Sequence, residues 1–249
     1  MIDVAFAPND VEPADVAGRA VVVIDVLRAT TTICAALDHG ARAVIPAADT
    51  EDAARLAQAL DRRDVVLAGE RNLDPIPGFQ VGNSPAEMTA ETVRGRSVVM
   101  TTTNGTRALL AAGHGKAVII AAGVNLTAAG ARARELLADH GDLLIICGGR
   151  EGGFGIDDAY VAGRIVVGAM GGSRSRKGLS DAAIAAVDLV RRYGDRIDRV
   201  LAISSAGRAL SRGGYRDDIA YAASVDRHPV VPVFRERRVT LGAAVAARP

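Results

Sequence analysis

The chain has 249 residues, of which 49% are apolar and 24% are charged, and its formal net charge is +1. This composition is typical of a globular protein with a substantial core. A charge near zero gives no overall field toward nucleic acid or an anionic membrane, and aromatic residues, at 3%, are too scarce for base-stacking platforms. We therefore expect neither nucleic acid nor a membrane as a partner.

The amino terminus reads MIDVAFAPND and lacks the basic start and the long apolar core of a signal peptide. No apolar run approaches the roughly 20 residues that cross a bilayer. Cys34 and Cys147 lie far apart in the sequence and form no CxxC pair, so neither a disulfide framework nor a zinc site built on paired cysteines is indicated. We expect a cytoplasmic protein.

Two stretches of the chain repeat one pattern. They begin at Arg19 and Arg96, and each reads as a β-branched run, a threonine-rich loop, an alanine- and leucine-rich helix, a His-Gly stop and a second apolar run. A further helix and a third strand follow in each copy, and both third strands end in glycine, with Glu70 or Glu151 after it. Chance similarity between short alanine-rich segments is the alternative to a duplication.

Strands that alternate with helices are typical of a parallel sheet covered by helices. We therefore predict an α/β fold of two similar βαβαβ units, which form mainly parallel sheet and are followed by a helical C-terminal part. The predicted units are residues 1–95 and 96–249, either as two domains or within one compact domain.

The chain changes character after Glu151. We predict helices over residues 157–170, 181–195, 198–214 and 217–226, an arginine-rich solvated loop over 171–180, and one closing strand within 228–241.

Polar side chains gather in four loops that follow predicted strands. They are Asp25, Arg28 and Thr30 to Thr32 in the first loop, Glu70, Arg71, Asn83 and Ser84 in the second, Thr101, Thr102, Thr103, Asn104 and Gly105 in the third, and Glu151, Asp157 and Asp158 in the fourth. Open α/β folds bind ligands at the carboxyl ends of their strands, so we expect the four loops to converge on one cleft. The second loop is too long for an idle turn.

The third loop, within VVMTTTNGTRALLAAG, places four threonines just before a predicted helix. One threonine is enough to cap a helix. Hydroxyls beside the free N–H groups of a helix N-terminus suit phosphate or another oxyanion. A phosphate site is therefore our interpretation, and an elaborate N-cap followed by a turn is the alternative.

The fourth loop carries acidic residues that could cap the next helix. Together with Asp25 and Glu70, however, they form an oxygen-only ligand set, which suits Mg²⁺. Familiar phosphate motifs are absent from the sequence. There is no Gly-Lys-Ser/Thr of a P-loop, Gly153 stands where a tyrosine phosphatase needs arginine after Cys147, and Leu27 replaces the second aspartate of a DxD motif.

Three histidines, His39, His114 and His140, each precede a glycine at a predicted helix end. A cationic side chain there favours the helix dipole, so we interpret them as helix-end residues. Cys147 ends an apolar run and is interpreted as a small buried hydrophobe.

At this point the motifs resemble those of the ComB family of 2-phosphosulfolactate phosphatases. The resemblance rests on DVLRATTTI, GERN with GFQVGNSPAE, TTTNGTRAL, CGGREGGFGIDDAYVAG, SSAGRAL with DDIAYAASVD, and VVPVF, which together run from Asp25 to Phe234. One departure is visible, since Asp157-Asp158 stands where Glu-Asp is expected.

The resemblance implies Mg²⁺-dependent hydrolysis of 2-phospho-3-sulfolactate to sulfolactate and phosphate, a step toward coenzyme M. We assign catalytic roles to Asp25, Arg28, Glu70 and Asp158, substrate or phosphate binding to Arg71, Asn83, Ser84, Thr101, Thr102, Thr103, Asn104 and Gly105, and metal binding to Asp25, Glu70, Glu151, Asp157 and Asp158. Arg28 and Arg71 suit a carboxylate or sulfonate, because guanidinium binds such anions through two hydrogen bonds. Either a metal-bound water or Asp25 attacks the phosphorus.

Two other functions remain open at this stage. The chain could hydrolyse another small phosphorylated carboxylic acid, such as phospholactate or phosphoglycolate, or it could bind phosphate without turnover. Anion binding alone would not need so many carboxylates. A homodimer is one expectation for a parallel α/β domain with exposed helices, although no seam is identifiable in the sequence.

Overall fold

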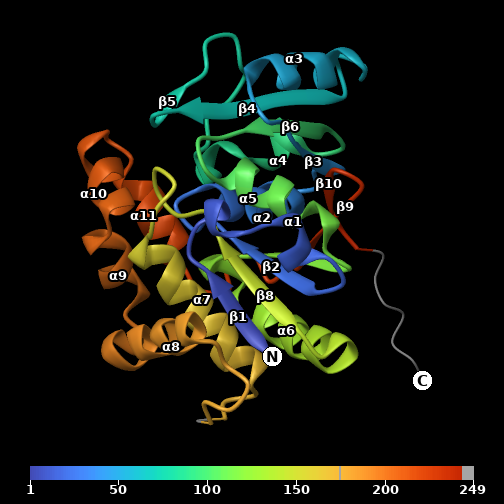
Figure 1. Ribbon diagram of the computed structural model, residues 1–249. Helices are drawn as coiled ribbons and strands as arrows, with labels where there is room; N and C mark the ends of the chain where they lie inside the picture. The colour runs from blue at the N-terminus through green and yellow to red at the C-terminus, as the bar shows by residue number, and fades with distance from the viewer. Residues whose placement is uncertain (174, 243–249) are drawn as a thin grey trace.

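Ten strands form one sheet in the computed structural model, which describes residues 1–173 and 175–242 (Figure 1). The strands are β1 (Ile2–Ala5), β2 (Ala20–Ile24), β3 (Ala43–Pro46), β4 (Val65–Arg71), β5 (Asp74–Pro75), β6 (Ser97–Thr101), β7 (Ala117–Ala121), β8 (Leu143–Cys147), β9 (Pro232–Arg235) and β10 (Arg238–Leu241). Their order across the sheet is β1-β8-β2-β7-β9-β10-β3-β6-β4-β5.

Eleven α-helices and four short 3₁₀ helices accompany the sheet within the described ranges. The α-helices are α1 (Pro13–Val16), α2 (Ala29–Asp38), α3 (Thr50–Gln58), α4 (Ala90–Val93), α5 (Gly105–Ala111), α6 (Leu126–His140), α7 (Ile156–Ala169), α8 (Asp181–Tyr193), α9 (Ile197–Ile203), α10 (Ser205–Arg212) and α11 (Arg216–Ala222). The 3₁₀ helices are η1 (Pro8–Asp10), η2 (Pro85–Glu87), η3 (Ala112–His114) and η4 (Gly123–Asn125). In the part of the chain that is described, no helix has the length and apolar character to cross a membrane.

The strands and helices of the two predicted βαβαβ units are all present, and the α/β fold with a mostly parallel sheet is confirmed. The two units exchange their first strands. β2 lies in parallel between β8 and β7, which follow it much later in the chain, and β6 lies in parallel between β3 and β4, which precede it. The boundary between residues 95 and 96 stays a prediction, because one sheet holds strands from both sides of it.

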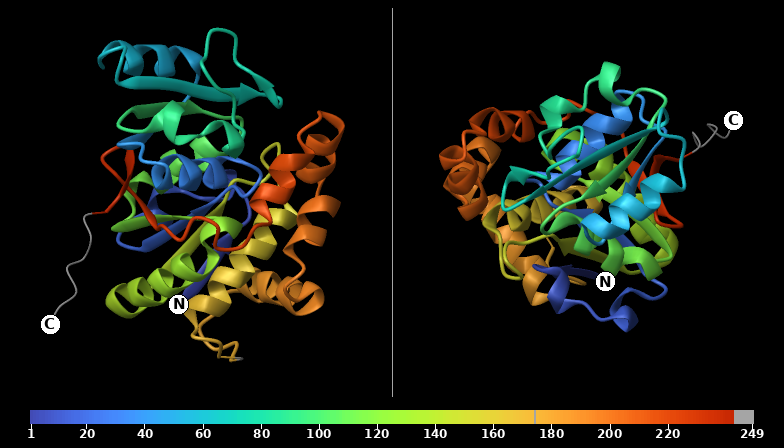
Figure 2. Two further views of the ribbon diagram at one scale, coloured as in Figure 1. Left: turned by 180° about the vertical axis from the view of Figure 1, so that it is seen from behind. Right: turned by 90° about the horizontal axis from the view of Figure 1, so that it is seen from above.

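Helices cover both faces of the sheet (Figure 2), and successive residues of β2 point alternately into the cores on the two faces. Val22 and Ile24 belong to a core shared with α6 and α7, whereas Val21 and Val23 belong to a core shared with α2 and α5. Continuous apolar strands such as AVVVI are what two buried faces require. The helices thereby bury both faces of β2.

The closing segment forms a hairpin, so the prediction of one strand within residues 228–241 was wrong. β9 and β10 pair antiparallel, and β10 also pairs with β3. The turn between them consists of Glu236 and Arg237, with φ values of 51° and 58°. A two-residue hairpin turn favours Asn-Gly or Asp-Gly at these positions, so the usual sequence signal is missing.

The helix predicted over residues 198–214 is also wrong, because it is two helices. Ser204 adopts an extended backbone between α9 and α10, and its hydroxyl accepts the N–H of Gly207 at 2.8 Å as the N-cap of α10. A Cβ on Gly207 would overlap the carbonyl oxygen of Leu201. The close approach of the two helices is therefore possible only with glycine there.

The remaining C-terminal helices confirm the predictions. α7 and α8 cover most of the predicted spans 157–170 and 181–195, and α11 forms within 217–226 with one additional residue at its start. The predicted loop over 171–180 contains residue 174, which lies outside the described residues. His39 and His140 lie at the ends of α2 and α6, as expected.

Candidate active site

A pocket opens where the loops after β2, β4, β6 and β8 meet α10. Ten of the predicted site residues line it, namely Asp25, Arg28, Glu70, Asn83, Thr102, Thr103, Asn104, Glu151, Asp157 and Asp158. In Figure 1, β4 and β6 run across the top of the molecule, and β8 runs diagonally below them. The predicted convergence of the four loops on one cleft is confirmed.

Four predicted residues lie outside the pocket lining: Arg71, Ser84, Thr101 and Gly105. Arg71 donates to the hydroxyl of Thr101 at 2.9 Å, so these two side chains bind each other. Ser84 donates to Asp218 at 2.5 Å. Gly105 lies under the pocket at the start of α5. These contacts support the walls of the pocket.

Asp25 is buried directly after β2. Its Oδ1 accepts the N–H of Ala29 at 3.3 Å, while no described residue donates to its Oδ2. Burial raises the pKa of Asp25 to about 7, and the nearby carboxylates of Asp157 and Glu70 add to the rise. The Asp25 carboxyl therefore lines the pocket in surroundings that do not fully compensate a negative charge on it.

Asp158 has a different task, although it lies beside Asp25. Its Oδ1 accepts the N–H of Val26 at 2.8 Å and its Oδ2 accepts the N–H of Gly149 at 2.9 Å. Asp158 thus ties the loop after β2 to the loop after β8. Burial, together with Asp157 and Asp25, raises its pKa well above the usual range.

Asp157 precedes it in the first turn of α7. Burial raises the pKa of Asp157, against the lowering effect of the backbone N–H groups at this helix start. A hydrogen bond from the side chain of Ser204, before α10, also lowers the pKa of Asp157. Unlike Glu70 and Asp158, however, Asp25 and Asp157 do not use both oxygens to hold backbone N–H groups of other loops, so they can bind a ligand.

Glu70 organises the threonine loop. Its Oε1 accepts the N–H of Thr103 at 2.8 Å, and its Oε2 accepts the N–H of Leu73 at 2.9 Å and the hydroxyl of Thr103 at 3.1 Å. Both oxygens are therefore engaged. The other predicted acidic ligand, Glu151, lies at the rim, where its side chain is 80% exposed and pairs with Arg150 at 3.4 Å.

The threonines of the loop after β6 line the pocket and also form hydrogen bonds within the loop. Thr102 accepts the N–H of Thr106 at 3.2 Å, and the hydroxyl of Thr106 donates to the carbonyl of Thr102 at 3.1 Å. This reciprocal pair supports the start of α5, whose N-cap residue, Asn104, makes no side-chain capping hydrogen bond. The side chain of Asn104 makes no hydrogen bond to a described residue and lines the pocket, so it is available to an anion.

Arg28 is held by two residues that the sequence interpretation missed, Asp218 and Tyr215. Its guanidinium, 3% exposed, donates to Asp218 at 2.7 Å and lies 4.5 Å from the centre of the Tyr215 ring. Asp218 is fixed in turn by Ser84. The motif DDIAYAASVD contains Asp218, but the 190 residues between it and Arg28 leave no local signal for the pair.

Asn83 is the remaining buried polar group of the pocket. Its side chain is almost fully buried, and its Oδ1 has no hydrogen-bond partner among the described residues. A buried acceptor without a partner costs about 1–3 kcal/mol. A bound ligand or water that donates to this oxygen would remove that cost.

The chemistry of the donors fits a divalent cation bound by oxygen. Asp157 raises the pKa of the buried Asp25, and the two arginines that line the pocket among the described residues are already paired, Arg28 with Asp218 and Arg150 with Glu151. Mg²⁺ prefers one or two carboxylates together with water and phosphate oxygens. A cation between Asp25 and Asp157 would compensate their charge.

Comparisons with known proteins were consistent over nearly the whole chain. The profile of the family described as 2-phosphosulpholactate phosphatase matches residues 5–237. A protein of Symbiobacterium thermophilum, named a probable 2-phosphosulfolactate phosphatase, is 41% identical over 233 residues, 93% of this chain and 98% of that protein. Proteins of the same name from Thermus thermophilus and Thermotoga maritima are 40% and 35% identical, over 87% and 94% of this chain and 88% and 95% of their own.

Proposed function

This chain belongs to the 2-phosphosulfolactate phosphatase family, and we propose that it hydrolyses 2-phospho-3-sulfolactate to sulfolactate and inorganic phosphate with the help of Mg²⁺. The family match also confirms the resemblance found in the motifs. The observation that carries the proposal is one pocket in which buried carboxylates, Asp25 and Asp157, lie beside a buried arginine, Arg28. These groups match a ligand that carries both a phosphate and a second anionic group.

The residues divide the work of phosphoryl transfer, which depends on positioning and on compensation of charge. Mg²⁺ held by Asp25 and Asp157 would supply positive charge to the phosphate oxygens. The hydroxyl of Thr102 and the amide of Asn104 donate to the phosphate. Asp25 either attacks the phosphorus or holds the attacking water, and its free Oδ2 suits both roles.

The second half of the substrate binds at Arg28. Its guanidinium can donate two parallel hydrogen bonds to a carboxylate or a sulfonate. Asp218 and Tyr215 hold the guanidinium in place, so little side-chain entropy remains to be lost on binding. Glu70 and Asp158 keep the loops of the pocket in position rather than contact the phosphate.

The direct test follows phosphorus NMR of 2-phosphosulfolactate incubated with the purified protein, with Mg²⁺ and separately with a chelator. Metal-dependent release of phosphate is the expected result. Turnover of phospholactate or phosphoglycolate instead would keep the reaction and change the substrate. Binding without turnover of any of these compounds would overturn the proposal in favour of an anion-binding protein.

We expect Asp218→Asn to raise KM for the substrate at least about 10-fold, because Arg28 loses the group that orients it. An unpaired buried charge should also destabilise the fold by about 3 kcal/mol. Kinetics and thermal unfolding of the variant check both effects. Asp217→Asn, at the adjacent exposed position, is the matched control. An unchanged KM in Asp218→Asn would show that Arg28 does not bind substrate.

Mg²⁺ should raise the melting temperature of the substrate-free protein, since it compensates the charges of Asp25 and Asp157. At a concentration 100 times the dissociation constant the gain is about 2.7 kcal/mol, or roughly 5–10 °C. Asp157→Asn should lose most of this shift, whereas Asp139→Asn, exposed on α6, should keep it. Scans in Mg²⁺ and in sodium salt of equal ionic strength make the comparison. Equal shifts in both variants would exclude Asp157 as a ligand.

A further inference from the structure

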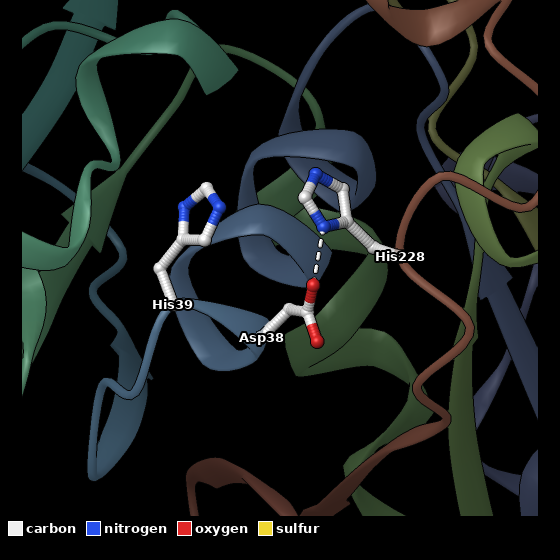
Figure 3. A group of neighbouring side chains, drawn as sticks. All are labelled: Asp38, His39 and His228. Carbon is white, nitrogen blue, oxygen red and sulfur yellow. Dashed lines mark hydrogen bonds and ion pairs between the residues drawn. The ribbon is translucent and has the colours of Figure 1, made fainter.

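A second group of metal-ligand side chains lies at the other end of α2. Asp38 is the last residue of this helix, His39 is its C-cap, and His228 comes from the loop between α11 and β9 (Figure 3). One ligand atom of each lies within 4.8 Å of the others, which no other trio of such side chains in the described residues achieves. The ten residues of α2 make a helix about 15 Å long, so this group is separate from the pocket.

His39 is oriented as a metal ligand would be. Its Nδ1 lies 2.5 Å from the carbonyl oxygen of Met88. A carbonyl oxygen can only accept, so Nδ1 carries the proton and Nε2 keeps a free lone pair. Histidines that bind metals commonly donate their second nitrogen to a backbone carbonyl in this way. In Figure 3 the ring of His39 lies beside His228 and Asp38, and the His39 and His228 rings meet edge to face.

His228 and Asp38 supply the other two ligand atoms. His228 is 3% exposed, with its Nδ1 2.6 Å from Oδ2 of Asp38 and its Nε2 2.7 Å from the hydroxyl of Tyr221. If the Nε2–H donates to Tyr221, a cation can take the place of the proton between Nδ1 and the carboxylate. Two ligand atoms of one tetrahedral Zn²⁺ lie about 3.3 Å apart, so the carboxylate of Asp38 must move slightly away from Nδ1 of His228. Its side chain is 34% exposed and has room to move.

We propose that Asp38, His39 and His228 form a second metal site, which binds Zn²⁺ or a similar first-row divalent cation. Two imidazoles and one carboxylate are ligands that Zn²⁺ prefers, whereas Mg²⁺ prefers oxygen alone. Three protein ligands leave one position for water. The ion would join the end of α2 to the segment that follows α11.

This connection bears on the pocket. α2 begins after Arg28, and α11 carries Asp218, its partner. The proposed site would therefore connect the C-terminal end of α2 to the segment after α11. These two helices carry the residues of the buried Arg28–Asp218 pair at or near their N-terminal ends. Zn²⁺ binding is accordingly expected to raise the melting temperature, because it stabilises only the folded state.

The test titrates Zn²⁺ into the metal-free full-length protein against a chromophoric chelator, in the presence of excess Mg²⁺. One Zn²⁺ per chain is expected, and Co²⁺ in its place should give the visible absorption of a four-coordinate site. His39→Gln and His228→Gln should each weaken binding at least about 10-fold, since changes of partners around the ligands already cost that much. His114→Gln, at an exposed position, is the control and should bind as the original chain does.

Circular dichroism shows whether each variant is folded. Should His228→Gln fail to fold, His39→Gln decides, because this ring is only partly buried. The proposal is overturned if the chain binds no stoichiometric Zn²⁺, or if both histidine variants bind it as tightly as the control. Loss of binding in Asp25→Asn instead would assign the ion to the pocket. Phosphatase activity plays no part in these readouts, so this proposal and the proposed function can fail separately.

Discussion

Asp25→Asn is expected to abolish turnover and also to stabilise the protein in the absence of metal. The variant keeps the shape of the side chain but loses the charge and the nucleophilic oxygen at Oδ2. Loss of an essential catalytic group normally costs 100-fold or more in kcat, about 2.7 kcal/mol of transition-state stabilisation. Steady-state kinetics at saturating Mg²⁺ measure this effect.

The gain in stability follows from the buried carboxylate. The pKa of Asp25 rises from 3.8 to about 7 on folding, chiefly through burial, so the folded chain binds more protons than the unfolded chain between these values. The stability of the original protein therefore falls as pH rises through this interval, and the neutral asparagine avoids the loss. The variant should melt at a higher temperature at pH 8, and the difference should vanish near pH 4.

Asp139→Asn is the matched control, because it removes an exposed carboxylate from α6. It should change neither kcat nor the pH dependence of unfolding. If Asp25→Asn keeps more than a tenth of the original kcat, Asp25 is neither the nucleophile nor an essential ligand. A lower melting temperature at pH 8 would show that the carboxylate is compensated by a partner.

Gly105→Ala is expected to damage both the fold and the pocket. A Cβ on Gly105 would overlap the Cβ of Ala29 and would lie 2.7 Å from Oδ2 of Asp25. Added volume in a packed interior costs about 1–3 kcal/mol, and here it also pushes the start of α2 away from the start of α5. Asp25 lies between them, so we expect a loss of kcat of about 10-fold or more.

Gly113→Ala provides a sharp control for that prediction. The nearest side-chain atom to its Cβ would be 3.9 Å away, and neither glycine has a positive φ, so backbone strain does not separate the two variants. Gly113→Ala should therefore keep the melting temperature and kcat of the original chain, whereas Gly105→Ala should lower both. Similar values for both would mean that α2 and α5 separate without harm to the pocket.

The sequence predicted what local patterns determine. Apolar runs, helix periodicity and the polar loops located β2, β4, β6 and β8 and most of the pocket, because each pattern lies within a few residues. The hairpin turn at Glu236 was missed because Glu-Arg does not favour a two-residue turn, and the break at Ser204 was missed although serine is a favoured N-cap residue. The pairing of β2 with β7 and β8 could not be predicted in this way, because the strands lie far apart in the sequence.

The roles of the acidic residues show the same limit at the site. From the sequence, metal binding was assigned to five carboxylates and a catalytic role to three of them, but only contacts in space separate their roles. Glu70 and Asp158 use both oxygens on backbone N–H groups, and Glu151 lies at the rim. Asp218 was not assigned any role, because its partner Arg28 lies 190 residues away.

The exchange of first strands governs the order in which the chain can fold. Within residues 1–173 and 175–242, β2 pairs only with β7 and β8, so it has no neighbouring strand until residues beyond 117 have been made. At about 5–20 residues per second, a ribosome needs several seconds to supply them. During that time the segment AVVVI has both its edges and its apolar faces open to other chains. A nascent chain of this protein is therefore exposed to aggregation at β2 until β7 and β8 have been made.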